Sequence, residues 1–123
     1  MTDKTFLVKE PKIIKPIPNG AYTGVIKTVA YRDKPFEYAD VLISINEIPE
    51  AEIEAGFSSK EISPTSAFGK FISQFQQLKV GETVNPSSVL VGRKVRLMVM
   101  NIPGKKDATK AYPQVVKGTV TPL

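Results

Sequence analysis

The order in which strand-type and helix-type segments follow one another constrains the fold of this chain most. Strand-like alternation or β-branched and aromatic content marks residues 20–32, 36–46, 51–59, 92–101 and 112–120. Residues 63–78 have helical spacing instead, because their apolar residues recur every three or four positions. These residues are Phe68, Phe71, Ile72, Phe75 and Leu78. The chain is therefore predicted to be mostly β, with one helix between its third and fourth strands.

Three strands, a helix and two further strands are the order of the OB-fold, a five-stranded Greek-key barrel. Gly24 is expected to mark a bend, since an interior glycine often lies at a bulge or a barrel corner. The start of residues 51–59 also suits a helical turn, and α+β packing without a barrel is the structural alternative. We predict an OB-fold domain over residues 20–123, preceded by a basic, proline-containing arm over residues 1–19.

The composition excludes most catalytic chemistry. The 123 residues contain neither cysteine nor histidine, so disulfides, thiol or imidazole catalysis and the usual zinc sites are excluded within this chain. The glutamates of residues 47–54 alternate along a predicted hairpin, which is typical of a solvated rim, whereas a metal site needs convergent carboxylates. We therefore predict a protein that is not an enzyme and that has no cofactor and no metal site.

The charge balance favours a phosphate-bearing partner. The chain has 17 Lys and Arg residues against 12 Asp and Glu residues, a net charge of +5, and a basic domain attracts polyanions at long range. No apolar run approaches the roughly 18 residues that span a bilayer, and no secretory signal pattern opens the chain. We expect a cytoplasmic protein without a membrane partner.

The sequence AYRDKPFEY, at residues 30–38, places three aromatic residues beside two cations. If RDKP forms a four-residue hairpin loop, Tyr31 lies opposite Phe36, and opposite residues share a face. One face of this ribbon is then small and aliphatic and is expected to face the core. It contains Ile26, Thr28, Ala30, Ala39, Val41, Ile43 and Ile45. The face expected to point outward contains Lys27, Val29, Tyr31, Phe36, Tyr38, Asp40 and Leu42.

Exposed rings beside cations suit a protein that binds single strands, because rings stack on bases while Lys and Arg contact the phosphates. In an OB barrel the loops between strands one and two and between strands four and five flank this surface. The residues predicted to contact nucleic acid are Lys27, Tyr31, Arg32, Lys34, Phe36, Tyr38, Lys94, Arg96, Lys105, Lys106, Lys110 and Tyr112. The alternative is a subunit or protein interface, since exposed apolar patches also mark such contacts.

Three pieces of sequence carry a family resemblance. They are GAYTGVI at residues 20–26, SPTSAFGKFISQF at residues 63–75 and LVGRKVRLMV at residues 90–99. In order and placement they resemble the small OB-fold single-stranded DNA-binding proteins that bacteriophages encode. With their spacing they cover about residues 20–120, most of the chain.

The resemblance implies largely sequence-independent binding of single-stranded DNA during phage replication or recombination, in the cytoplasm of the host. It also implies a homodimer or higher homo-oligomer, with replication or recombination proteins as further partners. The preference for DNA over RNA rests on the resemblance alone, because no residue pattern here reads a 2′-hydroxyl. The competing interpretations are single-stranded RNA binding and a protein-interaction or virion-structural OB module.

Overall fold

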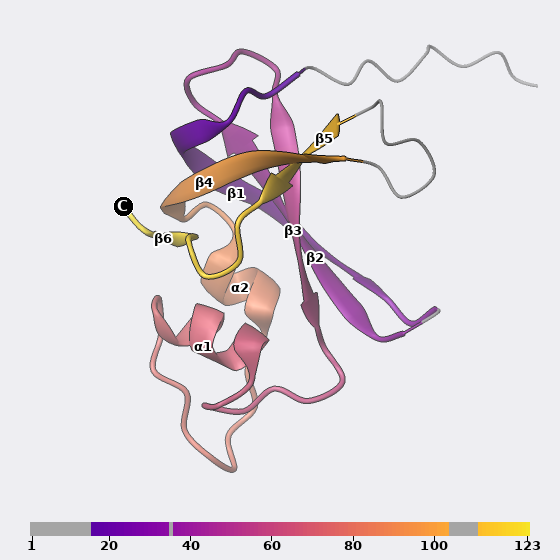
Figure 1. The fold of residues 1–123 in the computed structure, drawn as a ribbon. Coiled ribbons are helices and arrows are strands. Elements are labelled where there is room, and N and C mark those ends of the chain that lie inside the picture. The colour runs from indigo at the N-terminus through magenta and orange to yellow at the C-terminus, as the bar shows by residue number, and fades with distance from the viewer. Residues whose placement is uncertain (1–15, 35, 104–110) are drawn as a thin grey trace, which may run out of the picture.

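The computed structural model describes residues 16–34, 36–103 and 111–123. Over these residues the chain is mostly β, as predicted, with six strands in one antiparallel sheet and two short helices (Figure 1). The elements are β1 (Gly20–Arg32), β2 (Tyr38–Ile45), β3 (Glu52–Ser58), α1 (Ala67–Ser73), α2 (Pro86–Leu90), β4 (Lys94–Pro103), β5 (Ala111–Val115) and β6 (Thr121–Pro122). The prediction of a single helix between the third and fourth strands is wrong, because both α1 and α2 lie there.

The sheet has the order β3-β2-β1-β4-β5, and the short β6 pairs with β4. The long β1 is central, since its first half pairs with β4 and its second half pairs with β2. β3 and β5, at the two ends of this order, contact one another. No backbone pairing joins them in the described part of the chain, so the sheet is not closed into a barrel there.

The core lies between the inner face of the sheet and the two helices. The four alternate residues of β2 from Ala39 to Ile45 are buried, as the sequence predicts, and so are Val95, Leu97 and Val99 of β4. α1 contacts β3 and α2 contacts β1, so the helices cover one end of the sheet (Figure 1). Ile17, which precedes β1, is also buried in this core.

Side-chain caps fix where both helices begin. The Ser66 Oγ accepts a hydrogen bond from the Gly69 N–H, and the Asn85 side chain accepts one from the Ser88 N–H. α2 also has Pro86 in its first turn, where the missing N–H costs nothing. α1 is shorter than residues 63–78, but the later apolar residues Phe75 and Leu78 still pack against the core.

The far end of the β1–β2 ribbon has a different register from the predicted one. Arg32 pairs with Tyr38 and Tyr31 pairs with Ala39, so the connecting loop comprises residues 33–37 instead of four residues. Because paired residues share a face, Tyr31 lies on the same face as the buried Ala39. Tyr38 lies on the opposite face. The prediction that the two tyrosines share one outward face is therefore wrong.

A β-bulge at Lys27 explains why Tyr31 and Tyr38 lie on opposite faces. In the described ribbon Lys27 has no partner on β2, although Ile26 and Thr28 on either side of it are paired. The extra residue shifts the alternation of faces by one position, so Val29 packs against the core while Thr28 is exposed. The irregularity thus lies three residues beyond Gly24, where the sequence predicts a bend.

Candidate nucleic-acid interface

The end of the β1–β2 ribbon projects away from the helices (Figure 1) and bounds an open hollow. The hollow has a volume of about 460 Å³ and is lined by Asp33, Phe36, Glu37, Tyr38, Ser58 and Lys60. It includes the end of β3 because Tyr38 pairs with Ser58, and the Ser59 N–H donates to the Glu37 carbonyl at 3.0 Å. Two aromatic rings and a lysine therefore meet solvent around one depression.

The three rings of this ribbon end differ in exposure. Phe36 is 68% exposed and Tyr31 is 53% exposed, while Tyr38 is half-buried. None of the three is sealed within the core. We define the ribbon-end site by these rings together with Arg32 and Lys34 of the same stretch of chain and Lys60, which lines the same hollow as Phe36 and Tyr38.

Arg32 makes the most specific contacts of the ribbon-end site. Its Nε donates to Asp40 Oδ2 at 2.8 Å, and its Nη2 donates to Asp40 Oδ1 at 3.4 Å. The guanidinium carbon also lies 5.0 Å from the centroid of the Tyr38 ring, within the range of a cation–π contact. Two residues of the neighbouring strand β2 thus hold the Arg32 head group in place.

Lys27, in the bulge, is separate from the ribbon end. Its Nζ forms an ion pair with Glu52 Oε2 of β3 at 2.8 Å, and both side chains are exposed. The other ion pair among the described residues is Arg32–Asp40. Exposed pairs of this kind are worth about 0–1 kcal/mol, so Lys27 stays available to a phosphate group.

The other predicted contact residues are not brought to the ribbon end. Val25 of β1 pairs with Lys94, and Arg32 lies seven positions further along the strand than Val25. At ~3.3 Å per residue this separation is about 23 Å along the strand. Arg96 lies further away still, opposite Thr23. Lys105, Lys106 and Lys110 lie outside the described residues.

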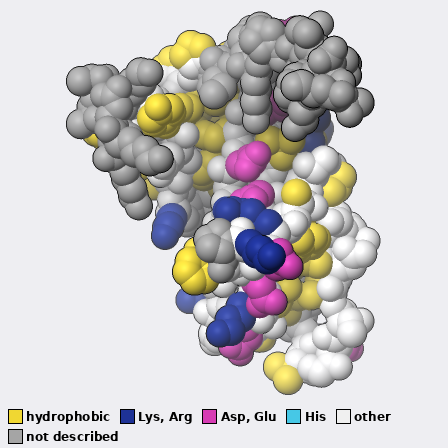
Figure 2. All heavy atoms as spheres, turned by 90° about the vertical axis from the view of Figure 1, so that its right-hand side faces the viewer, with side chains coloured by type: hydrophobic (Ala, Val, Ile, Leu, Met, Phe, Trp, Pro, Cys, Tyr) yellow, Lys and Arg dark blue, Asp and Glu magenta, His cyan; other side chains and the backbone are white. Residues whose placement is uncertain are grey.

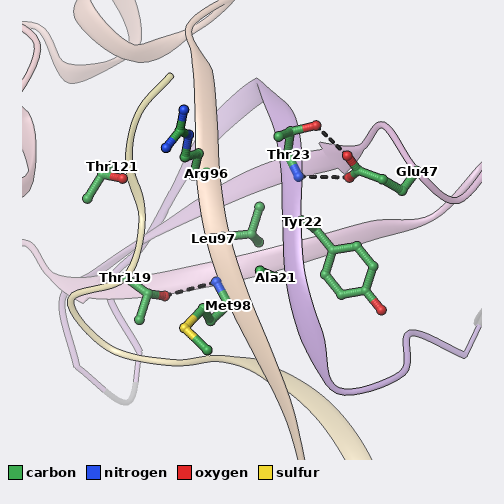
Figure 3. A pocket seen from close by; sticks show the side chains of 9 residues that line it. All are labelled: Ala21, Tyr22, Thr23, Glu47, Arg96, Leu97, Met98, Thr119 and Thr121. Carbon is green, nitrogen blue, oxygen red and sulfur yellow. Dashed lines mark hydrogen bonds between the residues drawn. The ribbon is translucent and has the colours of Figure 1, made fainter.

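Arg96 instead borders a second open hollow, on the face of β1, β4 and β6 (Figure 3). On the side away from Arg96, Thr23 is bonded to Glu47 twice. The Thr23 N–H donates to Glu47 Oε1 at 2.7 Å and the Thr23 hydroxyl donates to Oε2 at 2.6 Å. The bond from the Thr23 hydroxyl is the larger cause and the bond from the Thr23 N–H is the smaller one; together they hold the pKa of the Glu47 carboxyl below its ordinary value.

Tyr112 belongs to an exposed apolar strip on the outer face of β4 and β5. Its members are 40% to 53% exposed; they are Met98, Met100, Ile102 and Tyr112. They lie together because the methionines alternate with the buried residues of β4, and Tyr112 pairs with Ile102. We name these four residues the β4–β5 strip.

The sequence interpretation missed Lys60 of the ribbon-end site and Ser58, which lines the same hollow. A signal for them was present in the β2–β3 hairpin, whose two strands the sequence places correctly. Ser58 pairs with Tyr38. Continuing this pairing by two residues places Lys60 beside Phe36, so pairing β2 with β3 would have predicted both residues.

The net positive charge of the chain is not concentrated at the ribbon end. Seven of the 17 cationic residues but only three of the 12 acidic ones lie outside the described ranges, which leaves one net positive charge within them. Figure 2 shows acidic and basic side chains interspersed on the side of the molecule toward which the ribbon points. At the ribbon end, Asp33, Glu37 and Asp40 balance the three cations. Most of the net positive charge therefore lies in residues 1–15 and 104–110.

No cluster of acidic side chains in the described part of the chain could hold a metal ion. Neither α1 nor α2, the helices of the described ranges, is long and apolar enough to cross a membrane. Comparison of the sequence with protein-family models and with curated proteins finds no match.

Proposed function

We propose that this protein binds single-stranded DNA, largely independently of sequence, and holds bases at the ribbon-end site. The observation that carries the proposal is that the rings of Phe36 and Tyr38 and the cation Lys60 border one open hollow, with the exposed Tyr31, Arg32 and Lys34 at the same end of the ribbon. Each ring that stacks on a base contributes about 1–3 kcal/mol whatever the base, and the cations contact the phosphates. Because the ribbon projects, a DNA strand can run past the domain without entering a closed cavity.

The strand order supports an OB-type architecture for residues 20–123. The order β3-β2-β1-β4-β5, with helical residues between β3 and β4, is that of a Greek-key barrel left open between β3 and β5. OB barrels are often partly open, and they bind oligonucleotides beside the loop that joins their first two strands. The ribbon-end site occupies that loop and the strand ends next to it.

The resemblance to bacteriophage proteins supplies the proposed setting. It is DNA replication or recombination in a host cytoplasm, by a non-enzymatic homo-oligomer without a cofactor. DNA is preferred to RNA in this proposal on the resemblance alone.

Fluorescence anisotropy of a labelled oligo-dT, titrated with the protein over a salt series, tests the proposal. We expect the logarithm of the affinity to fall linearly with the logarithm of salt concentration. Phe36→Ala and Tyr38→Ala should each weaken binding about 5- to 150-fold, the equivalent of ~1–3 kcal/mol per ring. Absence of binding at low salt, or binding that salt does not affect, would exclude the proposal.

Val80→Ala is the matched control, because Val80 is 90% exposed and lies on a loop outside the ribbon-end site. It should leave binding unchanged. Comparing Tyr112→Ala with Phe36→Ala shows which of the two surfaces holds the bases. If it weakens binding while Phe36→Ala does not, bases are held at the β4–β5 strip and not at the ribbon end.

The β4–β5 strip favours a second candidate function, a protein-interaction module. Exposed methionine and aromatic side chains on one sheet face are typical of contact surfaces between proteins. Under this function the protein forms a stable assembly that oligo-dT leaves unchanged. Sedimentation with and without oligo-dT separates the two candidates.

A further inference from the structure

Three side chains on the outer face of the ribbon end form a connected group. Arg32 of β1 pairs directly with Tyr38 of β2, and Asp40 lies two residues further along β2, on the same face. Arg32 donates to Asp40 at 2.8 Å and 3.4 Å, and its guanidinium carbon lies 5.0 Å from the Tyr38 ring centroid. Within the described residues Arg32 does not line the hollow that Tyr38 borders. The Tyr38 ring therefore has the guanidinium group as one neighbour and the hollow as another.

We propose that Arg32 offers its guanidinium plane as a stacking surface for a base and that Asp40 is the residue that positions it. This inference rests on the proposed function and changes the role of Arg32 from a phosphate contact to a base contact. Bases of single strands stack on arginine planes as well as on aromatic rings. Arg32, whose guanidinium carbon lies over the Tyr38 ring, then extends the stack of this ring by one further plane.

The contacts of Arg32 favour stacking over phosphate binding. Two of its five donors already point to the Asp40 carboxylate, so a phosphate could take this bidentate edge of the guanidinium only by displacing that carboxylate. The Asp40 side chain is only 19% exposed, whereas that of Arg32 is 50% exposed. Displacement would leave a partly buried carboxylate unpaired, which is costly. Stacking on the exposed plane keeps the ion pair intact.

The test compares Arg32→Lys with the unchanged protein on two ligands of equal phosphate number, oligo-dT and an abasic oligonucleotide. Lysine keeps the charge but lacks the planar group. We expect the variant to bind oligo-dT about fivefold or more weakly, the loss of one stacked base. Its affinity for the abasic ligand and its salt dependence should be unchanged.

Asp40→Asn provides an independent readout, because it removes the charge that orients Arg32 without touching the stacking groups. We expect it to lower the ratio of oligo-dT affinity to abasic affinity, as Arg32→Lys does. Arg93→Lys is the matched control. Arg93 lies 6.0 Å from the Phe75 ring and donates to the Val89 carbonyl, away from the ribbon. This control should leave the ratio unchanged, and thermal unfolding would verify that each variant is folded.

The outcomes separate the inference from the function on which it rests. If Arg32→Lys lowers the affinity for both ligands equally, or leaves the affinity for oligo-dT unchanged, Arg32 does not act as a stacking surface. If Asp40→Asn leaves the affinity ratio unchanged, Asp40 does not position Arg32. If the unchanged protein binds neither ligand, the proposed function fails first.

Discussion

At the scale of single residues, Glu47 joins the start of β1 to the turn between β2 and β3. Its two carboxylate oxygens accept the backbone N–H and the hydroxyl of Thr23. Both bonds favour the charged form and lower the pKa of Glu47 from its ordinary value of 4.5. A carboxyl group whose pKa is lowered on folding adds stability above its unfolded pKa. That stability is lost as the pH falls through the folded pKa.

Glu47→Gln should therefore make the protein less sensitive to acid. We expect the unchanged protein to lose more thermal stability than the variant when the pH is lowered from neutrality to below about 4, the ordinary range of Glu. Unfolding midpoints measured by circular dichroism across this interval give the comparison. Thr23→Val, which removes the hydroxyl donor, should reduce the acid sensitivity in the same direction. Identical pH profiles for all three proteins would contradict the assigned cause.

The sequence around single residues was enough to predict that the aromatic side chains are exposed. It was not enough to predict on which face of the ribbon each of them lies. Rings next to a loop rich in charges seldom lie in a core, and Tyr31 and Phe36 are exposed. The bulge left no comparable signal. Val29 and Ala30 are both apolar, so either could face the core, and the prediction chose Ala30. One unpaired residue was enough to reverse the choice.

At the scale of elements, β1 pairs with both β2 and β4 at two residues, Gly24 and Val25. Gly24 is opposite Ile45 of β2 and also opposite Val95 of β4. A Cβ at Gly24 would lie 2.5 Å from the Ser44 carbonyl oxygen and 2.7 Å from Ile43 Cγ2. Atoms that are not bonded do not approach so closely. Glycine is needed here for the close approach of two strands.

Gly24→Ala should destabilise the fold by about 1–3 kcal/mol, the usual range for overpacking in a core. Urea unfolding would measure the loss. Gly56→Ala on β3 is the matched control, since a Cβ there would meet only the Asp40 carboxylate, at 3.4 Å. It should change stability by less than about 0.5 kcal/mol. Equal effects of the two substitutions would show that the approach at Gly24 is not limiting.

Strands were easier to predict from the sequence than helices or the placement of β4. β1 has the predicted bounds, and the inward faces of β2 and β4 follow from strict alternation. α2 has five residues, too few for a helical period to be recognised. The separation of Arg96 from the ribbon end is set by the length of β1 beyond its pairing with β4. No local pattern reports that length.

At the scale of the whole molecule, the contributions of charge and of base stacking to DNA binding should be separable by measurement. Lys105, Lys106 and Lys110 remain predicted phosphate contacts. Changing all three to Gln should make the salt dependence of oligo-dT binding shallower by about two, since each single-strand phosphate contact contributes ~0.7 to the log–log slope. Anisotropy titrations over a salt series measure this slope.

The matched control changes three lysines of the described residues to Gln, namely Lys70, Lys79 and Lys117. It removes the same net charge outside the predicted contacts, so the slope should stay the same. Phe36→Ala should lower affinity without altering the slope. If the two triple variants behave alike, only net charge matters, and the loop lysines are not contacts.

The bulge at Lys27 has a consequence for how such a chain can change. Ile26 and Thr28 already face adjacent partners on β2, so loss of residue 27 would leave every later pair, and every ring, where it is in the ladder. The additional twist that a bulge introduces would disappear, together with the Lys27–Glu52 ion pair. The residues that the β1–β2 ribbon exposes are thus encoded separately from the direction in which it points, and deletion of this one residue would turn the same surface in a new direction.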